Sequence, residues 1–461
     1  MQHQQQSPTH RPLQILVLHP DLGIGGAERL VVDAAVGLQS TGHKVTVYTN
    51  HHDRTHCFEE TRDGTLDVRV CGDFLPRSIG GRFMVLCAIV RAIYLAIAVT
   101  LNGALREADV VFCDQVSAWI PILKYAGARV FFYCHFPDLL LSKRGGMLKA
   151  IYRWPVDMFE ECTTGMADDI AVNSRFTADI FKRTFTRLSH NPQILYPGIR
   201  LDAYDRPIDT AAETLAPLKT ERTMIVSINR FERKKHIALA IEAFVRLRDD
   251  AIVSHEAFDR LRLVIAGGYD KRVAENVAYL AELDRLAGED YGLTTYTAWD
   301  HRAPAPEQAQ VVFLPSFDET QRSYLLDRAR ALVYTPSGEH FGIVPVEAMY
   351  ARLPVVAVAD GGPTETVLDG ETGYLCPADP AAFATAIGRL LSEETSVAAM
   401  GARGRDWVRS QFTLAAFVER LDALLARLAE VPKPREHSLL EPLVLFVISV
   451  LVPAFIILYF Y

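Results

Sequence analysis

Two glutamates, Glu339 and Glu347, lie in the segment SGEHFGIVPVEAM with seven residues between them. The preceding residues, ALVYTP, predict a strand, and the run that begins at Ile343 is typical of a helix. Gly338 and Gly342 would let the loop backbone approach a ligand closely. Because a helix N-terminus attracts phosphate, we expect the carboxylates to accept hydrogen bonds from sugar hydroxyls on either side of a diphosphate.

The same two glutamates have a simpler structural interpretation. Glu339 could be a solvated loop charge, and Glu347 a carboxylate that interacts favourably with its own helix dipole. The spacing alone leaves both interpretations open.

A second group of candidate residues is basic. Arg230 and Lys235, in NRFERKKH, follow the predicted strand TMIVSI at its carboxyl end. Two cations in this place would stabilise a departing diphosphate. The alternative is a solvated basic loop.

The N-terminal part of the chain offers a glycine loop and a histidine. Gly25 and Gly26, in DLGIGGAER, lie between a predicted strand and a helix and would allow close approach to a phosphate. The loop is not GxGxxG, so an ordinary tight turn is the alternative. His135 ends the apolar strand in FFYCHFPD, where it would reach a ligand, although a structural role is the alternative.

A repeated pattern of strands and helices must position these residues. LQILVL, ADVVFCDQ, ARVFFYCHFPD and DIAVNS predict strands separated by helices, and the pattern restarts at TMIVSI. Such alternation is typical of parallel sheets covered by helices on both faces. We predict an α/β chain with two Rossmann-like, doubly wound domains that face a cleft.

The C-terminal residues predict a membrane segment. A helix over 439–461 would rise about 34 Å, which matches one bilayer core, although a buried core helix is the alternative. The predicted divisions are a disordered tail 1–12, an acceptor- and membrane-facing domain 13–205, a donor-binding domain 215–410, a closing helix 411–430, a linker 431–438 and a hydrophobic membrane segment 439–461.

A basic and aromatic stretch in the first domain, LLLSKRGGMLKAIYRWP, predicts a membrane interface. Its cations are Lys143, Arg144, Lys149 and Arg153. Leucines and aromatic residues interleave with them, as in helices that lie on a bilayer. A solvated basic face is the alternative. The apolar stretch 83–99 favours a core or interface helix over a span.

The composition excludes some functions. A formal net charge of −8 argues against a nucleic-acid binder. The seven cysteines form no CxxC, which predicts reduced thiols in a cytosol-facing protein. The polar N-terminal tail has no apolar run of the kind found in signal peptides.

The motifs together resemble those of retaining nucleotide-sugar glycosyltransferases with the GT-B fold. SGEHFGIVPVE is similar to their E-x7-E motif, NRFERKKH to their R-x4-K segment and GIGGAER to their glycine loop. With YCHFPDLLL, NSRFTADIF and DGGPTETV, the set resembles the family 4 type endoplasmic-reticulum α-1,3/1,6-mannosyltransferases of dolichol-linked oligosaccharide assembly. The likeness covers residues 13–430.

This resemblance implies a retaining transfer of α-1,3 and α-1,6 mannose from GDP-mannose to Man1GlcNAc2-PP-dolichol, giving Man3GlcNAc2-PP-dolichol. Glu339 would hold the donor mannose and Glu347 the ribose. Arg230 and Lys235 would neutralise the GDP leaving group, and His135 would lie beside the anomeric carbon. The other implied donor contacts are Gly25, Gly26, Phe341, Gly342, Ile343, Gly361 and Gly362.

No D-x-D occurs, so we expect no metal and no cofactor beyond the GDP-mannose substrate. The implied partners are the dolichol-diphosphate oligosaccharide, the membrane and other mannosyltransferases of the same pathway, without nucleic acid. The implied location is the endoplasmic reticulum membrane, with the catalytic domains on its cytosolic face. The alternatives are another retaining GT-B enzyme with a lipid acceptor and a catalytically silent, membrane-anchored scaffold.

Overall fold

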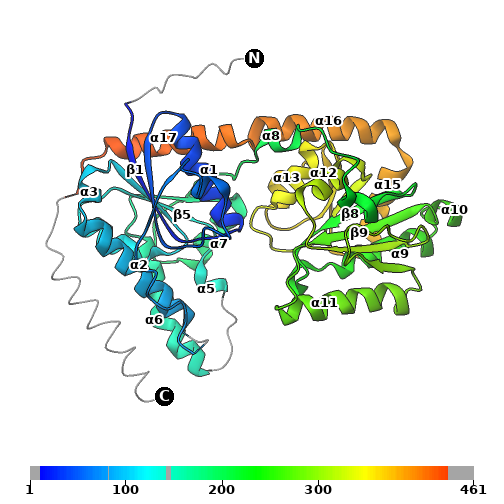
Figure 1. Cartoon of the computed structure of the whole chain (residues 1–461), viewed down its shortest axis with the longest axis horizontal. Coiled ribbons are helices and arrows are strands. Elements are labelled where there is room, and N and C mark those ends of the chain that lie inside the picture. The colour runs from blue at the N-terminus through cyan, green and yellow to red at the C-terminus, as the bar shows by residue number, and fades with distance from the viewer. Residues whose placement is uncertain (1–10, 81–82, 142–146, 435–461) are drawn as a thin grey trace. The chain divides into compact units, whose positions relative to one another are not determined.

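The computed structural model describes residues 11–80, 83–141 and 147–434, and the chain divides into two compact units (Figure 1). Unit 1 comprises the chain up to Tyr196 and from Phe417 onward, and unit 2 comprises Pro197–Ala416. The first division therefore falls before the predicted domain end at residue 205. The predicted membrane segment 439–461 lies outside the described residues.

Unit 1 is built on a parallel sheet of seven strands with the order β3-β2-β1-β4-β5-β6-β7. Apolar runs of strand length form its centre, where β4 and β5 are buried along their whole length. The strands are β1 (Gln14–Leu22), β2 (Lys44–His52), β3 (Asp67–Val70), β4 (Val110–Asp114), β5 (Val130–Cys134), β6 (Asp169–Val172) and β7 (Gln193–Ile194).

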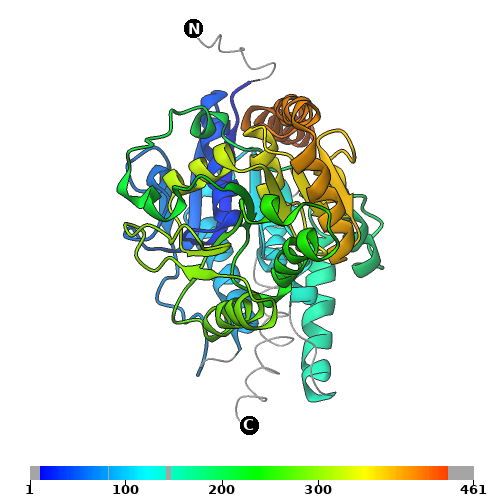
Figure 2. The same cartoon turned by 90° about the vertical axis from the view of Figure 1, so that its right-hand side faces the viewer.

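Helices cover both faces of this sheet. The helices α2 and α6 pack against the same apolar cluster on one face (Figures 1 and 2), whereas α17 lies beside α1. The helices are α1 (Gly26–Ser40), α2 (Met84–Leu101), α3 (Ala104–Glu107), α4 (Ile120–Tyr125), α5 (Asp138–Leu141), α6 (Met147–Thr164), α7 (Arg175–Thr184) and α17 (Leu414–Glu430).

The predicted closing helix belongs largely to unit 1, where α17 packs on α1. A Cβ atom at Gly37 would lie 2.1 Å from Cγ2 of Val418, so only glycine allows this approach. Nε2 of the buried His43 lies 2.8 Å from Oδ1 of Asp422. The chain therefore returns to its first unit at its C-terminal end.

Unit 2 contains a second parallel sheet of seven strands, with the order β10-β11-β9-β8-β12-β13-β14. The repeated strand–helix pattern of the sequence is thus confirmed as two parallel-sheet α/β units. The strands are β8 (Thr223–Ile228), β9 (Leu261–Gly267), β10 (Thr295–Thr297), β11 (Val311–Pro315), β12 (Ala331–Tyr334), β13 (Val355–Val358) and β14 (Gly373–Cys376).

The helices of unit 2 alternate with its strands. Two of them matter for the candidate site: α13 follows β12 directly, and α12 precedes it. The helices are α8 (Leu201–Tyr204), α9 (Ala238–Asp249), α10 (His255–Phe258), α11 (Ala274–Arg285), α12 (Glu319–Arg328), α13 (Ile343–Tyr350), α14 (Pro363–Thr366), α15 (Pro380–Ser392) and α16 (Glu394–Gln411).

Each sheet has a point at which the strand order reverses. In unit 1, β1 lies next to β4, and in unit 2, β8 lies next to β12, although long connections separate them in the chain. Loops leave the carboxyl ends of two such strands in opposite directions, which opens a crevice that commonly binds ligands.

The helix α2 is the one described helix long and apolar enough to cross a membrane by length and composition. It nevertheless forms part of the core, because Ala92, Leu95, Ala96 and Val99 are almost fully buried against the sheet. Met84, at its start, is exposed. The core-helix interpretation of residues 83–99 therefore describes one face of this helix.

Candidate functional site

The strand reversal in unit 2 brings a basic loop and an acidic loop together. Nζ of Lys235, after β8, lies 2.5 Å from Oε2 of Glu339, after β12. Thr335, also after β12, donates its hydroxyl to the carbonyl of Lys235 at 2.8 Å. Two of the predicted site residues are thus in direct contact, although 104 positions separate them in the chain.

The environment of Glu339 favours its charged form. Burial by itself would raise the pKa of this carboxyl, but the charge and hydrogen bond of Lys235 outweigh it and lower the pKa below its ordinary value. Tyr334 also hydrogen-bonds to Glu339, and burial together with this carboxylate raises the pKa of the tyrosine. The site therefore presents a negative and a positive group side by side.

The glycines after β13 hold the Glu339 loop by backbone contact. Gly362 donates its N–H to the carbonyl of Glu339 at 2.7 Å. A Cβ at Gly361 would lie 2.4 Å from that carbonyl oxygen, and a Cβ at Gly362 would lie 2.3 Å from Cα of Phe341. Gly361 also has a φ of +68°, which favours glycine. Gly361 and Gly362 therefore set the position of the loop that carries Glu339.

The residues between the two glutamates have different surroundings. Gly342, at a φ of +81°, precedes the first turn of α13, and the side chain of Ile343 is partly exposed there. The ring of Phe341 is buried and packs 5.7 Å from the ring of Phe412. A ligand contact at Phe341 would thus be made by its backbone, whereas the N–H groups at Gly342 and Ile343 begin the helix.

Glu347 is almost fully buried within α13, at 5% exposure. One of its carboxylate oxygens forms an ion pair with Arg322 of α12, and Tyr204 of α8 hydrogen-bonds to the same side chain. The second oxygen, Oε2, has no hydrogen-bond partner among the described residues. A buried oxygen without a partner is costly, so it is available to a hydroxyl donor.

Arg230 is placed apart from these contacts. Its side chain is 64% exposed, and its nearest ion-pair partner is Glu232, at 4.0 Å. It follows the carboxyl end of β8, where its stem lies over Gly268. The structure thus leaves the Arg230 guanidinium open to a ligand, but it does not bring it into contact with Lys235 or Glu339.

The glycine loop of unit 1 has an open side. A Cβ at Gly26 would meet no atom within 4 Å, and a Cβ at Gly25 would meet only the flexible side chain of Glu28. Gly25 is extended, with a φ of −169°, so its backbone needs no glycine-specific conformation. This openness would allow a ligand to approach the backbone at the start of α1.

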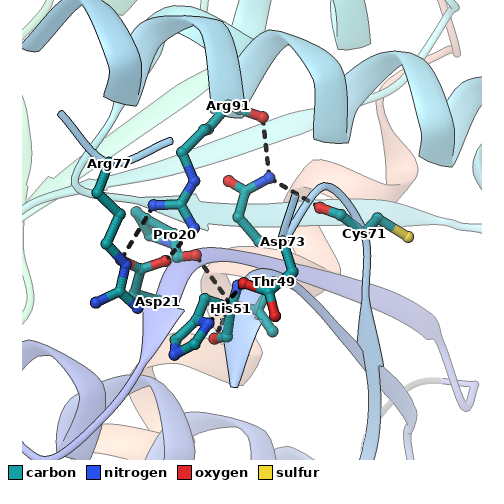
Figure 3. A network of polar contacts seen from close by, with 9 residues as sticks. Pro20, Asp21, Thr49, His51, Cys71, Asp73, Arg77 and Arg91 are labelled. Atoms are coloured by element: carbon teal, nitrogen blue, oxygen red, sulfur yellow. Dashed lines mark hydrogen bonds and ion pairs between the residues drawn. The ribbon is translucent and has the colours of Figure 1, made fainter. Parts of the chain in front are cut away.

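A partly buried ion pair anchors this loop to the apolar helix α2. Figure 3 shows Arg91 reaching Asp21 at the end of β1, with Arg77 on the other side of the carboxylate. The two terminal nitrogens of Arg91 lie 3.2 and 2.7 Å from the two oxygens of Asp21. Asn50 donates to the carbonyls of Arg91 and Cys71 at 3.0 and 2.9 Å. The single charge of α2 thus fixes the strand end that precedes Gly25.

His135 belongs to a chain of three side chains at the carboxyl edge of the unit 1 sheet. Its Nε2 lies 2.8 Å from Oδ2 of Asp114, whose Oδ1 lies 2.8 Å from Nδ1 of His19. His135 follows β5, Asp114 ends β4, and His19 lies within the second half of β1. His19 and Asp114 are fully buried, whereas the His135 side chain is partly exposed. His135 is therefore the exposed end of the chain.

A carboxyl group of α5, Asp138, and one of α6, Glu160, lie close to each other after His135 in the chain. Asp138 donates its backbone N–H to Oε1 of Glu160 on α6, at 2.7 Å. Burial, with the neighbouring Asp138, raises the pKa of Glu160 to about 8. Burial likewise raises the pKa of Asp138 to about 6. At neutral pH the Glu160 carboxyl thus favours its protonated form.

The predicted membrane-interface residues are only partly within the described chain. Arg153 is buried, and its guanidinium lies 2.9 Å from Asp157 one helical turn further along α6. The prediction that Arg153 is a lipid-facing cation is wrong, because the side chain is buried. The basic stretch considered in the sequence ends before Asp157, which is the acidic partner of Arg153. Lys143 and Arg144 lie outside the described residues, as does the side chain of Lys149. The exposed Trp154 follows Arg153 directly.

Several residues of these sites were not identified from the sequence. Asp114 carries a signal in retrospect, since it is a polar residue that ends an apolar strand, and His19 is the polar residue that directly follows the apolar run of β1. Arg322 and Tyr204 carry none, because their proximity to Glu347 depends on how α8 and α12 pack on α13. Asp360, which accepts the N–H of Gly338 at 2.8 Å, follows β13 and has the same strand-end signal.

Comparison with known proteins gives consistent results. Residues 214–407 match the family described as Glycosyl transferases group 1, and residues 24–203 match Glycosyltransferase Family 4. The chain is 53% identical over 433 residues to alpha-1,3/1,6-mannosyltransferase ALG2 of Rhizomucor pusillus, covering 93% of this chain and 95% of that protein. It is 46% identical to alpha-1,3/1,6-mannosyltransferase ALG2 of Homo sapiens, covering 90% of this chain and 96% of that protein.

Among solved structures, sucrose-phosphate synthase from Thermosynechococcus elongatus is similar with a TM-score of 0.68 and 19% identity. The match covers 90% of this chain and 99% of that chain. The likeness shows the fold, which consists of two parallel-sheet α/β domains as in the GT-B glycosyltransferases.

Proposed function

The chain belongs to the alpha-1,3/1,6-mannosyltransferase ALG2 family of glycosyltransferases, and we propose that it transfers mannose from GDP-mannose to a dolichol-linked oligosaccharide. The reaction adds an α-1,3 and an α-1,6 mannose to Man1GlcNAc2-PP-dolichol. The product is Man3GlcNAc2-PP-dolichol, a precursor in N-glycan synthesis.

The contact between Lys235 and Glu339 carries this proposal. A nucleotide sugar joins a neutral, hydroxyl-rich ring directly to a diphosphate, so its site needs a hydrogen-bond acceptor next to a cation. Lys235 and Glu339 supply these two groups 2.5 Å apart at a strand reversal, where ligands commonly bind. In this contact each group neutralises the other. When the donor binds, Lys235 turns to the diphosphate, and Glu339 accepts hydrogen bonds from the mannose hydroxyls.

The remaining donor contacts follow from the same arrangement. Oε2 of Glu347 is buried without a partner, and it accepts a ribose hydroxyl. The N–H groups at Gly342 and Ile343 face the diphosphate from the start of α13, where the helix dipole favours negative charge. Arg230, exposed after β8, supplies the second cation.

Transfer proceeds with retention of configuration at the anomeric carbon. The bond from C1 of mannose to the diphosphate oxygen breaks, and GDP departs with the electron pair. The acceptor hydroxyl oxygen bonds to C1 on the same face, and its proton passes to the departing phosphate. Lys235 and Arg230 stabilise the charge that develops on the phosphate. From unit 1, His135 acts at the reacting sugar, and the open loop at Gly25 and Gly26 admits the diphosphate.

The acceptor lipid implies a membrane location. We place the enzyme at the endoplasmic reticulum membrane, with both units on the cytosolic face and residues 439–461 in the bilayer. Lys143, Arg144 and Lys149 attract anionic lipid, and other mannosyltransferases of the pathway are neighbours there.

A variant that ends at residue 434 tests the proposed membrane attachment. It keeps the contacts of Val431 with Arg129 and of Lys433 with Ala108, so it should fold but leave the membrane fraction.

Incubation of the purified enzyme with radiolabelled GDP-mannose and lipid-linked Man1GlcNAc2 tests the proposed function. We expect the wild type to form the Man3 product and Lys235→Met to lower the rate about 100-fold, as for loss of one preorganised charge. Lys234→Met is the matched control, because this neighbouring lysine is 73% exposed and pairs with Glu232. It should react as the wild type does. Transfer only from a UDP-sugar, or no transfer and no GDP binding, would overturn the proposal.

A further inference from the structure

In the chain His19–Asp114–His135, only the partly exposed His135 has a part in the donor contacts proposed above, and the two buried residues behind it have none. This chain runs through the strand reversal of unit 1, since β1 and β4 are the neighbours at that point and β5 follows. Nδ1 of His19 lies 2.8 Å from Oδ1 of Asp114, and Nε2 of His135 lies 2.8 Å from Oδ2. Both are normal hydrogen-bond distances. One carboxyl group thus holds two imidazole rings.

Asp114 acts in this chain as a carboxylate. Burial by itself would raise the pKa of this carboxyl, but the charges and hydrogen bonds of His19 and His135 hold it below the ordinary value. A carboxylate only accepts hydrogen bonds, so both rings must donate to it. The proton of His19 is therefore on Nδ1, and that of His135 is on Nε2.

This assignment determines what His135 offers to a ligand. Its Nε2 is engaged, so Nδ1 is the remaining ring nitrogen, and in the neutral ring it carries a lone pair. The backbone carbonyl of His135 already accepts the side-chain N–H of Asn173 at 3.1 Å. The ring also packs edge-on against Tyr133, with 4.8 Å between the ring centroids. The orientation of the ring is thus fixed from two sides.

We propose that Asp114, braced by His19, is a positioning residue that holds His135 as the Nε2–H tautomer and so presents Nδ1 as a hydrogen-bond acceptor to a hydroxyl of the reacting sugar. The inference rests on the proposed role of His135. It adds that two buried residues, which touch no substrate, determine which ring nitrogen of His135 carries the proton.

Asp114→Asn tests the proposal, because it keeps the shape and changes the hydrogen-bond pattern. An amide has one acceptor oxygen and one donor nitrogen, so it can satisfy only one ring in the native tautomer. Where the amide nitrogen faces His135, the ring must move its proton to Nδ1, and the acceptor becomes a donor. A similar exchange in serine proteases produces the wrong tautomer of the catalytic histidine.

We expect kcat of Asp114→Asn to fall about tenfold or more, with KM for GDP-mannose and GDP affinity by calorimetry unchanged within about twofold. Asp168→Asn is the matched control. Asp168 lies at the amino edge of the same sheet, where it binds Lys124 and the N–H of Val130. It should retain the wild-type kcat. If Asp114→Asn also retained it while His135→Ala lost activity, Asp114 would have no positioning role.

The ring nitrogens of the full-length enzyme give a readout that needs no variant at Asp114. In ¹⁵N-histidine-labelled wild type, with His135→Gln used only to assign signals, we expect the shift of an unprotonated nitrogen for Nδ1 of His135 and of an N–H for Nε2. The opposite tautomer would overturn the inference even if Asp114→Asn failed to fold. If His135→Ala kept full activity, the proposed role of His135 would fail, and the tautomer would report separately on Asp114.

Discussion

Nζ of Lys235 lies 2.5 Å from Oε2 of Glu339, and the two side chains come from the strands between which the unit 2 sheet reverses its order. This contact pairs a cation with a partly buried carboxylate and favours the charged form of Glu339. The pair therefore has measurable consequences for stability as well as for catalysis.

The stability that Glu339 contributes should depend on pH. Its pKa is lower in the folded chain than its ordinary value, so the native state favours the charged carboxylate. The pair thus stabilises the native state above the ordinary carboxyl pKa, and this stabilisation is lost as the pH falls through the folded-state value. Glu339→Gln should therefore be less stable than the wild type at pH 7, and the difference should shrink in acid. A difference that grew in acid would contradict the pairing.

Glu160 should show the opposite dependence. Burial raises its pKa to about 8, so the unfolded chain loses this proton at a lower pH than the folded chain. Stability contributed by the protonated form is present in acid and is lost as the pH rises from about 4.5 to about 8. Glu160→Gln mimics the protonated form, so the variant should gain stability relative to the wild type over this range. Thermal unfolding at a series of pH values measures the stability difference between the variant and the wild type. A difference that does not change with pH would contradict the raised pKa of Glu160.

Gly361→Ala should destabilise the chain more than Gly370→Ala. Both glycines have a positive φ, +68° and +74°, so each substitution costs about 1–2 kcal/mol in backbone strain. Only at Gly361 does the new Cβ collide, 2.4 Å from the carbonyl oxygen of Glu339, whereas Gly370 has open space. Overpacking adds about 1–3 kcal/mol at Gly361. Chemical denaturation measures the difference, and GDP-mannose binding should weaken only in Gly361→Ala.

Removal of Asp21 should destabilise the chain more than removal of its ion-pair partner Arg91. The Arg91 side chain is 7% exposed and that of Asp21 is 35% exposed. Asp21→Ala leaves a buried unpaired guanidinium and should cost about 3–5 kcal/mol. Arg91→Met removes the buried charge and leaves the more exposed carboxylate, so it should cost less. Arg77→Gln is the control, since this exposed cation lies 3.4 Å from Asp21 and should contribute at most about 1 kcal/mol. Equal losses for the first two variants would argue against α2 as a core helix.

The sequence predicted local features well because these depend on short-range physics. Strand-length apolar runs, helical spacing and glycine loops placed Glu339, Lys235 and Arg230 after the correct strands. The contact of Lys235 with Glu339 could not be predicted from spacing, because it requires β8 to lie beside β12. That neighbour relation is a property of the whole sheet.

The same limit explains what the sequence analysis missed or misplaced. His135 was identified alone, whereas its partners Asp114 and His19 are brought to it by the order of β1, β4 and β5. Arg153 has the composition of a lipid-facing cation, but the rotation of α6 buries it beside Asp157. Burial of a single side chain depends on packing partners that are distant in the chain.

We propose that one donor site, built around Glu339, serves both mannose additions. The most direct test of this proposal gives Glu339→Ala the lipid-linked Man1 acceptor and, separately, each Man2 intermediate, with GDP-mannose as donor, and resolves the products by linkage. If Glu339 contacts the reacting sugar as we propose, the α-1,3 and α-1,6 rates should fall together, by about 100-fold or more, and further than in Glu347→Ala. If Glu339→Ala abolished one linkage while the other formed at the wild-type rate, a second donor site would have to exist, and Glu339 would not serve both additions.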